Sequence, residues 1–219
     1  MTSDSLRDRL RALPVFGDNL PEFDVDAAPD DPLTLLVAWL EQAIALPVAQ
    51  PHAMSIATAD RTGVPSNRTL LLKDVTAEGL WFATMSSSPK GLELSTNPRA
   101  AVVLYWREQG RQVRVTGEVR PGPRDVSDRD FLQRHPNARA TVIAGNQSEP
   151  IVSEAEFEAA VESARMRVAD TPGLVPEAWS AYVLRPETIE FWQAAVDREQ
   201  QRLLYSRVDN EWTRDRLWP

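Results

Sequence analysis

The two lysines of this chain are its first candidates for chemistry, because each stands where a positive charge could meet an anionic ligand. Lys73 and Lys90 contrast with twenty-two arginines. An ammonium is a compact, movable point charge that the planar guanidinium does not always replace. Lys90 follows Ser86-Ser-Ser-Pro, which is typical of a helix start, where hydroxyls and free backbone N–H groups favour an anion. The alternative is that both lysines are solvated surface residues.

A third cation, Arg68, shares an apolar run with Lys73 and raises a geometric question. The two residues are five positions apart, so on a regular strand their side chains point to opposite faces. Three interpretations are open. A bulge redirects one side chain, the two contact different parts of one ligand, or they bind different ligands.

Further polar residues could contact a ligand. Gln147 and Ser148 lie in a polar loop, where amide and hydroxyl groups could reach the edge of a planar ring. Trp192 closes an alternating stretch, and Arg198 and Arg202 are four apart in a charged segment. The structural alternatives are an ordinary turn, a packed aromatic and a solvated face.

The elements that must position these residues are mostly strands, with helices inserted between them. Residue periodicity and the capping signals at Asp31, Ser88 and Ser153 predict their boundaries. We expect helices at 6–13, 32–46, 89–96, 125–134, 137–144 and 153–169. We expect strands at 53–59, 66–73, 80–85, 100–106, 111–120, 178–184, 189–193, 201–207 and 212–217.

This order of elements predicts a mainly β fold with helices (α+β), built as an antiparallel barrel decorated by helices. Glycine is scarce, with nine residues, and no glycine-rich dinucleotide loop is present. A doubly wound nucleotide-binding fold is therefore disfavoured. We expect residues 1–30 to form a flexible arm and residues 31–219 to form a single domain.

Composition argues against several classes of function. The chain has 219 residues, a net charge of −8 and a pI of about 4.9, which argues against a nucleic-acid partner. It has no cysteine, and its two histidines lie far apart, so neither thiolate chemistry nor a metal site is expected. No apolar run approaches a membrane span of about 20 residues. No signal peptide is visible, so we expect a cytoplasmic protein.

Taken in order, these motifs resemble the pyridoxine (pyridoxamine) 5′-phosphate oxidase family of flavoproteins, which includes the phenazine-biosynthesis oxidases. The resemblance runs from the predicted helix 32–46 to the C-terminus with essentially no gaps, and no single motif carries it alone. The matching stretches are 68–73, 82–90, 97–98, 111–113, 147–148, 189–193 and 216–219.

The resemblance implies an FMN-binding split barrel that acts as a homodimer, with FMN at the subunit interface and dimerisation strands in 178–219. Arg68 and Lys90 would hold the FMN phosphate, Thr84 would assist, and Lys73 would lie near flavin and substrate. The second subunit would complete part of each site. The implied FMN-binding residues are Arg68, Thr69, Leu70, Leu71, Lys73, Ala83, Thr84, Lys90, Gln112, Gln147, Ser148, Trp192 and Arg202.

The substrate side departs from the family's pattern. The resemblance implies a substrate site formed by Lys73, Asp130, Arg134, Ala138, Arg198 and Gln200, with Arg198 as the catalytic residue that orients the substrate. Asp130 stands where the family has Tyr, Ala138 where it has Ser, and Gln200 where it has His. A carboxylate near a bound phosphate is repulsive, by roughly 1 kcal/mol or more at a few ångströms.

Two further departures concern the cofactor and the N-terminus. Pro89 replaces an Arg that usually precedes the second Lys, so one phosphate contact is missing and FMN binding could be weaker. The family's N-terminal Arg-x-x-Tyr element lacks its Tyr, because the first tyrosine of the chain is Tyr105.

The resulting hypothesis is an FMN-dependent oxidase, in which a substrate C–H gives hydride to the flavin and oxygen is reduced to hydrogen peroxide. Two substrates compete. Pyridoxamine or pyridoxine 5′-phosphate is the commoner one in the family, and a reduced aromatic ring of secondary metabolism is suggested by the stretch 103–108. The departures at Asp130, Ala138 and Gln200 weaken the case for the vitamin B6 substrate, but they do not support any other substrate. The alternative from another functional class is a binding module, a split-barrel protein that binds flavin without turning over a substrate.

Overall fold

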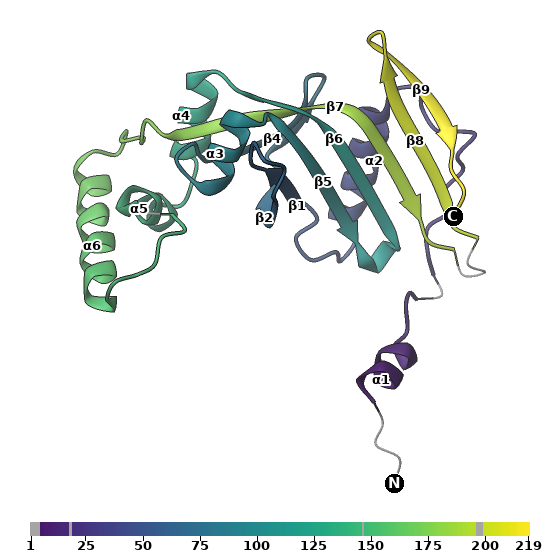
Figure 1. The fold of residues 1–219 in the computed structure, drawn as a ribbon, viewed down its shortest axis with the longest axis horizontal. Helices are drawn as coiled ribbons and strands as arrows, with labels where there is room; N and C mark the ends of the chain where they lie inside the picture. Colours follow the sequence, from purple (N-terminus) through teal and green to yellow (C-terminus); the bar gives the residue numbers. More distant parts are fainter. Residues whose placement is uncertain (1–4, 18, 146, 196–198) are drawn as a thin grey trace. The chain divides into compact units, whose positions relative to one another are not determined.

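The computed structural model describes residues 5–17, 19–145, 147–195 and 199–219. The helices, shown in Figure 1, are α1 (Leu6–Ala12), α2 (Pro32–Ala45), α3 (Pro89–Thr96), α4 (Arg124–Leu132), α5 (Pro136–Ala144) and α6 (Glu154–Asp170). The strands are β1 (Ala53–Ala59), β2 (Pro65–Leu71), β3 (Asp74–Thr76), β4 (Gly79–Met85), β5 (Arg99–Trp106), β6 (Arg111–Pro121), β7 (Trp179–Gln193), β8 (Gln201–Val208) and β9 (Glu211–Arg216).

All nine strands of the described chain belong to one sheet. Its order is β2-β1-β5-β6-β7-β4-β3, and β8 pairs with both β7 and β9. The pairs β1–β2, β3–β4, β4–β7, β7–β8 and β8–β9 are antiparallel. The predicted class, mainly β with helices, is therefore confirmed.

The chain divides into two compact units. The first unit comprises residues 1–51, 103–114 and 188–219, and the second comprises 52–102 and 115–187. No helix in the described residues is both long and apolar enough to cross a membrane.

Aromatic side chains form the core of the first unit. Asp31 caps α2 by accepting hydrogen bonds from two N–H groups of its first turn, as expected for Asp before Pro. Trp39 packs edge-to-face on Phe191 of β7, with 5.1 Å between ring centroids, and Phe191 packs similarly on Tyr205 of β8 at 5.8 Å. These contacts fix α2 against β7 and β8.

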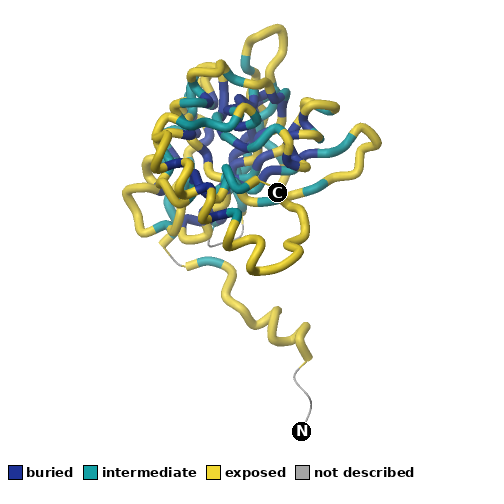
Figure 2. The backbone as a smooth tube through the Cα atoms, turned by 90° about the vertical axis from the view of Figure 1, so that its left-hand side faces the viewer, coloured by how far each residue is buried: buried dark blue, intermediate teal, exposed yellow. Residues whose placement is uncertain are grey.

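The segment before α2 differs along its length. Residues 5–15 are exposed, as the yellow tube in Figure 2 shows. Val25 and Ala28 are buried in the first unit. The Tyr205 hydroxyl donates a hydrogen bond to the carbonyl of Pro29 at 2.7 Å, and Arg214 donates to the carbonyl of Ala28. The part of this segment next to α2 is therefore held by β8 and β9.

The second unit places α3 directly at the end of β4. Ser88 caps the helix by accepting a hydrogen bond from the N–H of Gly91 at 3.3 Å. A Cβ on Gly91 would lie 2.4 Å from the carbonyl oxygen of Ser86 and 2.6 Å from that of Met85. Only glycine allows this approach, so the helix start and the strand end are packed backbone to backbone.

Strand β7 corrects a predicted boundary. Two separate strands were expected, at 178–184 and 189–193. The structure has one continuous strand from Trp179 to Gln193. Gly117 of β6 approaches β7 within the expected gap, since a Cβ there would lie 2.0 Å from the carbonyl oxygen of Arg185. Glycine permits this close contact between the backbones of the two strands.

Candidate functional site

A cavity of about 760 Å³ lies within the second unit. Its walls come from β2 and the residues after it, from β4, from α5, and from Gly145 and residues 147–153 before α6. Among the described residues, four charged side chains line it: Lys73, Arg134, Glu149 and Glu156.

The end of β2 resolves the question posed by Arg68 and Lys73. Thr69, Leu70 and Leu71 line the cavity, and the strand ends at Leu71. Lys73 therefore follows the strand instead of continuing its alternation, and it also lines the cavity. Arg68 is not among the lining residues. The strand predicted to end at Lys73 thus ends two residues earlier. Lys73 lines the cavity, whereas Arg68 does not.

Lys90, the first cation expected to hold a phosphate, is buried at the start of α3 with 5% of its surface exposed. Its Nζ donates to Thr84 Oγ1 at 3.2 Å and to Ser88 Oγ at 3.3 Å. Burial lowers the pKa of Lys90, the charge of Arg68 lowers it further, and Glu93 acts in the opposite direction.

An ammonium that is buried among hydroxyls is poorly compensated. Among the described residues, no carboxylate lies within ion-pair distance of Lys90. Thr84, which Lys90 contacts, lines the cavity together with Ala83. An anion bound against Thr84 would therefore meet a charge that the protein itself leaves unpaired.

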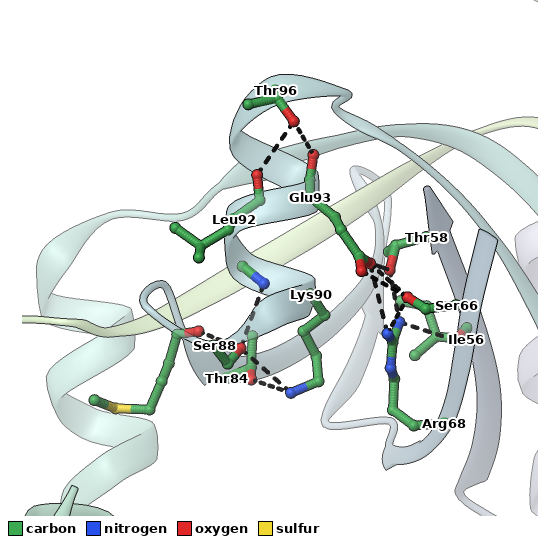
Figure 3. Close-up of polar contacts among 12 residues, drawn as sticks. Ile56, Thr58, Ser66, Arg68, Thr84, Ser88, Lys90, Leu92, Glu93 and Thr96 are labelled. Atoms are coloured by element: carbon green, nitrogen blue, oxygen red, sulfur yellow. Dashed lines mark hydrogen bonds and ion pairs between the residues drawn. The ribbon is translucent and has the colours of Figure 1, made fainter. Parts of the chain in front are cut away.

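Arg68 is held by a carboxylate and two hydroxyls, as Figure 3 shows. Its NH2 lies 3.5 Å from Glu93 Oε2, and its NH1 donates to Thr58 Oγ1 at 2.6 Å. It also donates to Ser66 Oγ. Ser66 and Thr58 in turn donate to the Glu93 carboxylate. The four side chains form one closed network.

Glu93 is a residue of this network that sequence reasoning missed. Desolvation acts to raise the pKa of Glu93, but hydrogen bonds from Ser66 and Thr58, followed by the charge of Arg68, lower it overall. Glu93 is three positions after Lys90, a spacing that places both on one face of α3. This spacing is the signal in the sequence that could have identified Glu93.

Lys73 forms an ion pair with Asp130 of α4, with Nζ 3.2 Å from Oδ1. The other oxygen of the carboxylate, Oδ2, accepts a hydrogen bond from Trp179 Nε1 at 3.0 Å. The side chain of Asp130 is 16% exposed and that of Lys73 is 35% exposed. The sequence placed Asp130 near the substrate, but it did not reveal the role of Trp179.

Arg134 follows α4 and lines the cavity. Its guanidinium lies over the Trp179 ring, 4.6 Å from the centroid, and its buried Nε has no hydrogen-bond partner. Burial lowers the pKa of Arg134, and Asp130 opposes that shift. Ala138, also expected at the substrate, is partly buried on α5 and is not among the lining residues.

Gln147 and Ser148 line the cavity from the segment before α6. Ser148 has φ +74°, a left-handed conformation that is uncommon for a residue other than glycine. Gly145 precedes them with φ +87°. Gln147 and Ser148 both lie in a turn, so the polar loop is a turn whose residues line the cavity.

Three other predicted residues lie together in the first unit. Trp192 Nε1 donates to Gln200 Oε1 at 2.8 Å. Trp192 is opposite Arg202 in the β7–β8 register. Arg202 donates through Nε and NH2 to Glu190 Oε1 at 2.9 and 2.8 Å. An expected FMN residue thus contacts an expected substrate residue.

Gln112, also in the first unit, is partly buried on β6. Arg198, the residue expected to orient the substrate, lies outside the described residues. Histidine, cysteine and tyrosine are absent from the cavity lining, and no group of three or more potential metal-ligating side chains occurs in the described chain. The lining residues supply charges and hydrogen bonds that can bind and orient a ligand.

Two family models match the chain. One is described as "Pyridoxamine 5'-phosphate oxidase" and covers residues 40–167. The other is described as "Pyridoxine 5'-phosphate oxidase C-terminal dimerisation region" and covers residues 179–219.

Similar proteins cover most of the chain. The pyridoxine/pyridoxamine 5′-phosphate oxidase of Pseudomonas paraeruginosa is 40% identical over 195 residues, which are 88% of this chain and 90% of that protein. The crystal structure of PhzG from Burkholderia lata 383, in complex with tetrahydrophenazine-1-carboxylic acid, is 31% identical with a TM-score of 0.85. It covers 93% of this chain and 100% of its own. This likeness confirms the expected fold, the split barrel decorated by helices.

Proposed function

The chain belongs to the pyridoxamine 5′-phosphate oxidase family, and on this premise we propose that it is an FMN-dependent oxidase of a small ring compound. The substrate loses two electrons and two protons, and molecular oxygen takes up both to become hydrogen peroxide. Bound FMN supplies the chemistry that accepts hydride from carbon. The protein's residues bind, orient and neutralise charge.

The observation that carries this proposal is the unpaired, buried ammonium of Lys90. It points to an anionic group at the start of α3, and it sits beside the Thr84 hydroxyl, which can also donate a hydrogen bond. The Ser88 hydroxyl, in contrast, already donates to the carbonyl of Met85 at 2.7 Å. This donor set fits a phosphate such as that of FMN.

Arg68 adds a second positive charge to the proposed phosphate site. Its ties to Glu93, Thr58 and Ser66 fix its position, so it would act on the phosphate without having to be ordered first. Pro89, at the first position of α3, supplies neither an N–H nor a cation. We therefore assign the phosphate to Lys90, Arg68 and Thr84, with one contact fewer than in the family's usual pattern.

The flavin ring is assigned to the cavity. Six of the residues that the resemblance implies for FMN line this cavity and support the assignment: Thr69, Leu70, Leu71, Ala83, Gln147 and Ser148. We assign Gln112, Trp192 and Arg202 to the FMN site of the partner subunit in a homodimer. The match of residues 179–219 to a dimerisation region supports this assembly.

Lys73 and Arg134 are assigned to the substrate, because both cations line the cavity. Arg198 and Gln200 would orient the substrate from the partner subunit, as the resemblance implies. Gln200 is held by Trp192, which would link substrate position to cofactor position. Hydride transfer to FMN needs no strongly basic side chain, which suits a cavity without histidine.

Two substrate classes have support. The names of the curated relatives support pyridoxine or pyridoxamine 5′-phosphate. The structure of PhzG with tetrahydrophenazine-1-carboxylic acid supports a reduced ring compound that carries a carboxylate. The Lys73–Asp130 ion pair is the feature of this chain that bears on the choice between a phosphate-carrying and a carboxylate-carrying substrate.

The first test is made on FMN-loaded protein without oxygen. Pyridoxine 5′-phosphate is added, and the visible flavin absorbance is followed. Bleaching, with hydrogen peroxide formed when air is admitted, is the result expected of a vitamin B6 oxidase. Bound FMN that stays unbleached with pyridoxine 5′-phosphate and with every reduced ring compound tried would instead identify a flavin-binding protein without turnover. A chain that fails to bind FMN at all would overturn the proposal.

A further inference from the structure

Asp130 occupies both of its carboxylate oxygens inside the protein. One oxygen lies 3.2 Å from Lys73 Nζ, and the other accepts the indole N–H of Trp179 at 3.0 Å. The carboxylate is therefore held in a fixed place beside the cavity. It compensates the charge of Lys73, one of the two cations that line this cavity.

Arg134 is the cation that remains. It has no ion pair within the described chain, and its guanidinium carbon lies over the Trp179 ring, 4.6 Å from the centroid. A planar guanidinium suits a carboxylate, which it can bind through two parallel hydrogen bonds. Trp179 thus positions both Asp130 and Arg134, one through its N–H and the other through its ring.

The remaining charges of the cavity are negative. Glu149 and Glu156 both line it, and neither forms an ion pair with a described residue. With Lys73 compensated by Asp130, one cation faces two further carboxylates in the lining. A ligand with two negative charges would gain little here, whereas one with a single negative charge can pair with Arg134.

From these contacts we propose that Asp130 is a specificity-determining residue that selects ring substrates carrying one carboxylate over those carrying a phosphate. The inference rests on the proposed oxidase function, since it names the substrate class of the same cavity. Glu149 and Glu156 are exposed to solvent, whereas Asp130 is held by Lys73 and Trp179. An additional negative charge within a few ångströms of the held Asp130 carboxylate should weaken binding about tenfold or more.

The test uses two probes with the same ring, 1-naphthoate and 1-naphthyl phosphate, at pH 8, where the phosphate is a dianion. Binding to FMN-loaded wild-type protein is measured by calorimetry and by the change in flavin absorbance. We expect 1-naphthoate to bind about tenfold more tightly. Asp130→Asn keeps the shape and can still accept from Trp179, and it should improve phosphate binding about tenfold while changing naphthoate binding less.

The matched control is Asp125→Asn. Asp125 is on the same helix, α4, and pairs with Arg129 at the surface with 71% of its side chain exposed. This change removes the same charge from the protein, so an effect of net charge alone would appear in both variants. We expect the ratio of the two affinities to stay at its wild-type value in Asp125→Asn.

Three outcomes would overturn the inference: wild-type protein that prefers the phosphate, naphthoate that does not bind, or equal ratios in the two variants. If circular dichroism shows that Asp130→Asn does not fold, the ratio of naphthoate to naphthyl phosphate affinity in the wild-type protein still tests the inference. FMN content is measured in every sample. Loss of FMN binding would count against the proposed function, whereas bound FMN with an unchanged ratio would count against the role of Asp130 alone.

Discussion

The ammonium of Lys90 differs from an ordinary surface lysine because it is buried without a carboxylate partner among the residues that the structure describes. Lys90→Met keeps the length of the side chain and removes its charge. We expect FMN to bind about ten to a hundred times more weakly, since hydrogen bonds to charged groups contribute about 1.5–3 kcal/mol each. Quenching of FMN fluorescence measures the affinity. Arg120→Met, which removes a surface cation paired with Glu118, serves as the control and should bind FMN like the wild type.

The same residue predicts a pH dependence of stability in the FMN-free protein. The pKa of Lys90 in the folded chain lies below its ordinary 10.5, so between these values the unfolded chain binds more protons. Stability therefore rises with pH in this window. Urea unfolding of wild type and Lys90→Met at pH 7 and at pH 9.5 should show the wild type gaining on the variant at the higher pH. A difference that is the same at both values would contradict this.

Glu93 is expected to stabilise the folded chain through Arg68, Ser66 and Thr58. Glu93→Gln should lower the free energy of unfolding by about 1–3 kcal/mol, because it weakens charge-assisted hydrogen bonds that are largely shielded from water. The folded pKa of Glu93 is lowered from 4.5, so its contribution is complete above pH 4.5 and is lost as pH falls through the folded value. Chemical unfolding between pH 7 and pH 3 measures this. Glu118→Gln, at an exposed pair, should change stability far less.

Helix α3 depends on one glycine for its place against β4. Gly91→Ala would put a methyl group 2.4 Å from a backbone oxygen, so the helix start has to move away from Ser86. We expect a loss of stability of about 1–3 kcal/mol, with weaker FMN binding because Lys90 moves with the helix. Thermal unfolding and FMN titration measure the two effects. Gly173→Ala, where a Cβ meets nothing within 4 Å, should leave both unchanged.

The expected homodimer is tested by the linkage between assembly and cofactor. If the partner subunit supplies part of each FMN site, FMN binds the dimer better than the monomer and must strengthen dimerisation. Sedimentation velocity over a dilution series should show the dimer persisting to lower concentration with FMN than without it. An assembly state that FMN does not affect would indicate that each chain completes its own site.

Much of the fold could be predicted from sequence because its signals are local. The caps at Asp31, Ser88 and Ser153 place three helix starts correctly, since capping depends on residues within one turn. Strand β1 was predicted from Ala53 to Ala59, as observed. The break expected between residues 184 and 189 was wrong, because β7 runs through it and packs there against Gly117 of β6. No local signal reports which residue faces which across a sheet.

The sequence by itself determined which residues of this chain carry charge beside the ends of strands and helices, and its order of motifs indicated the family. Only the tertiary structure decided what those charges meet. It pairs Arg68 with Glu93 and Lys73 with Asp130, and within the described chain the hydrogen bonds of the Lys90 ammonium go to the hydroxyls of Thr84 and Ser88. Such pairings join residues on different elements. Whether two charged side chains meet depends on where each strand ends and on how each helix packs. The packing of the whole core sets both.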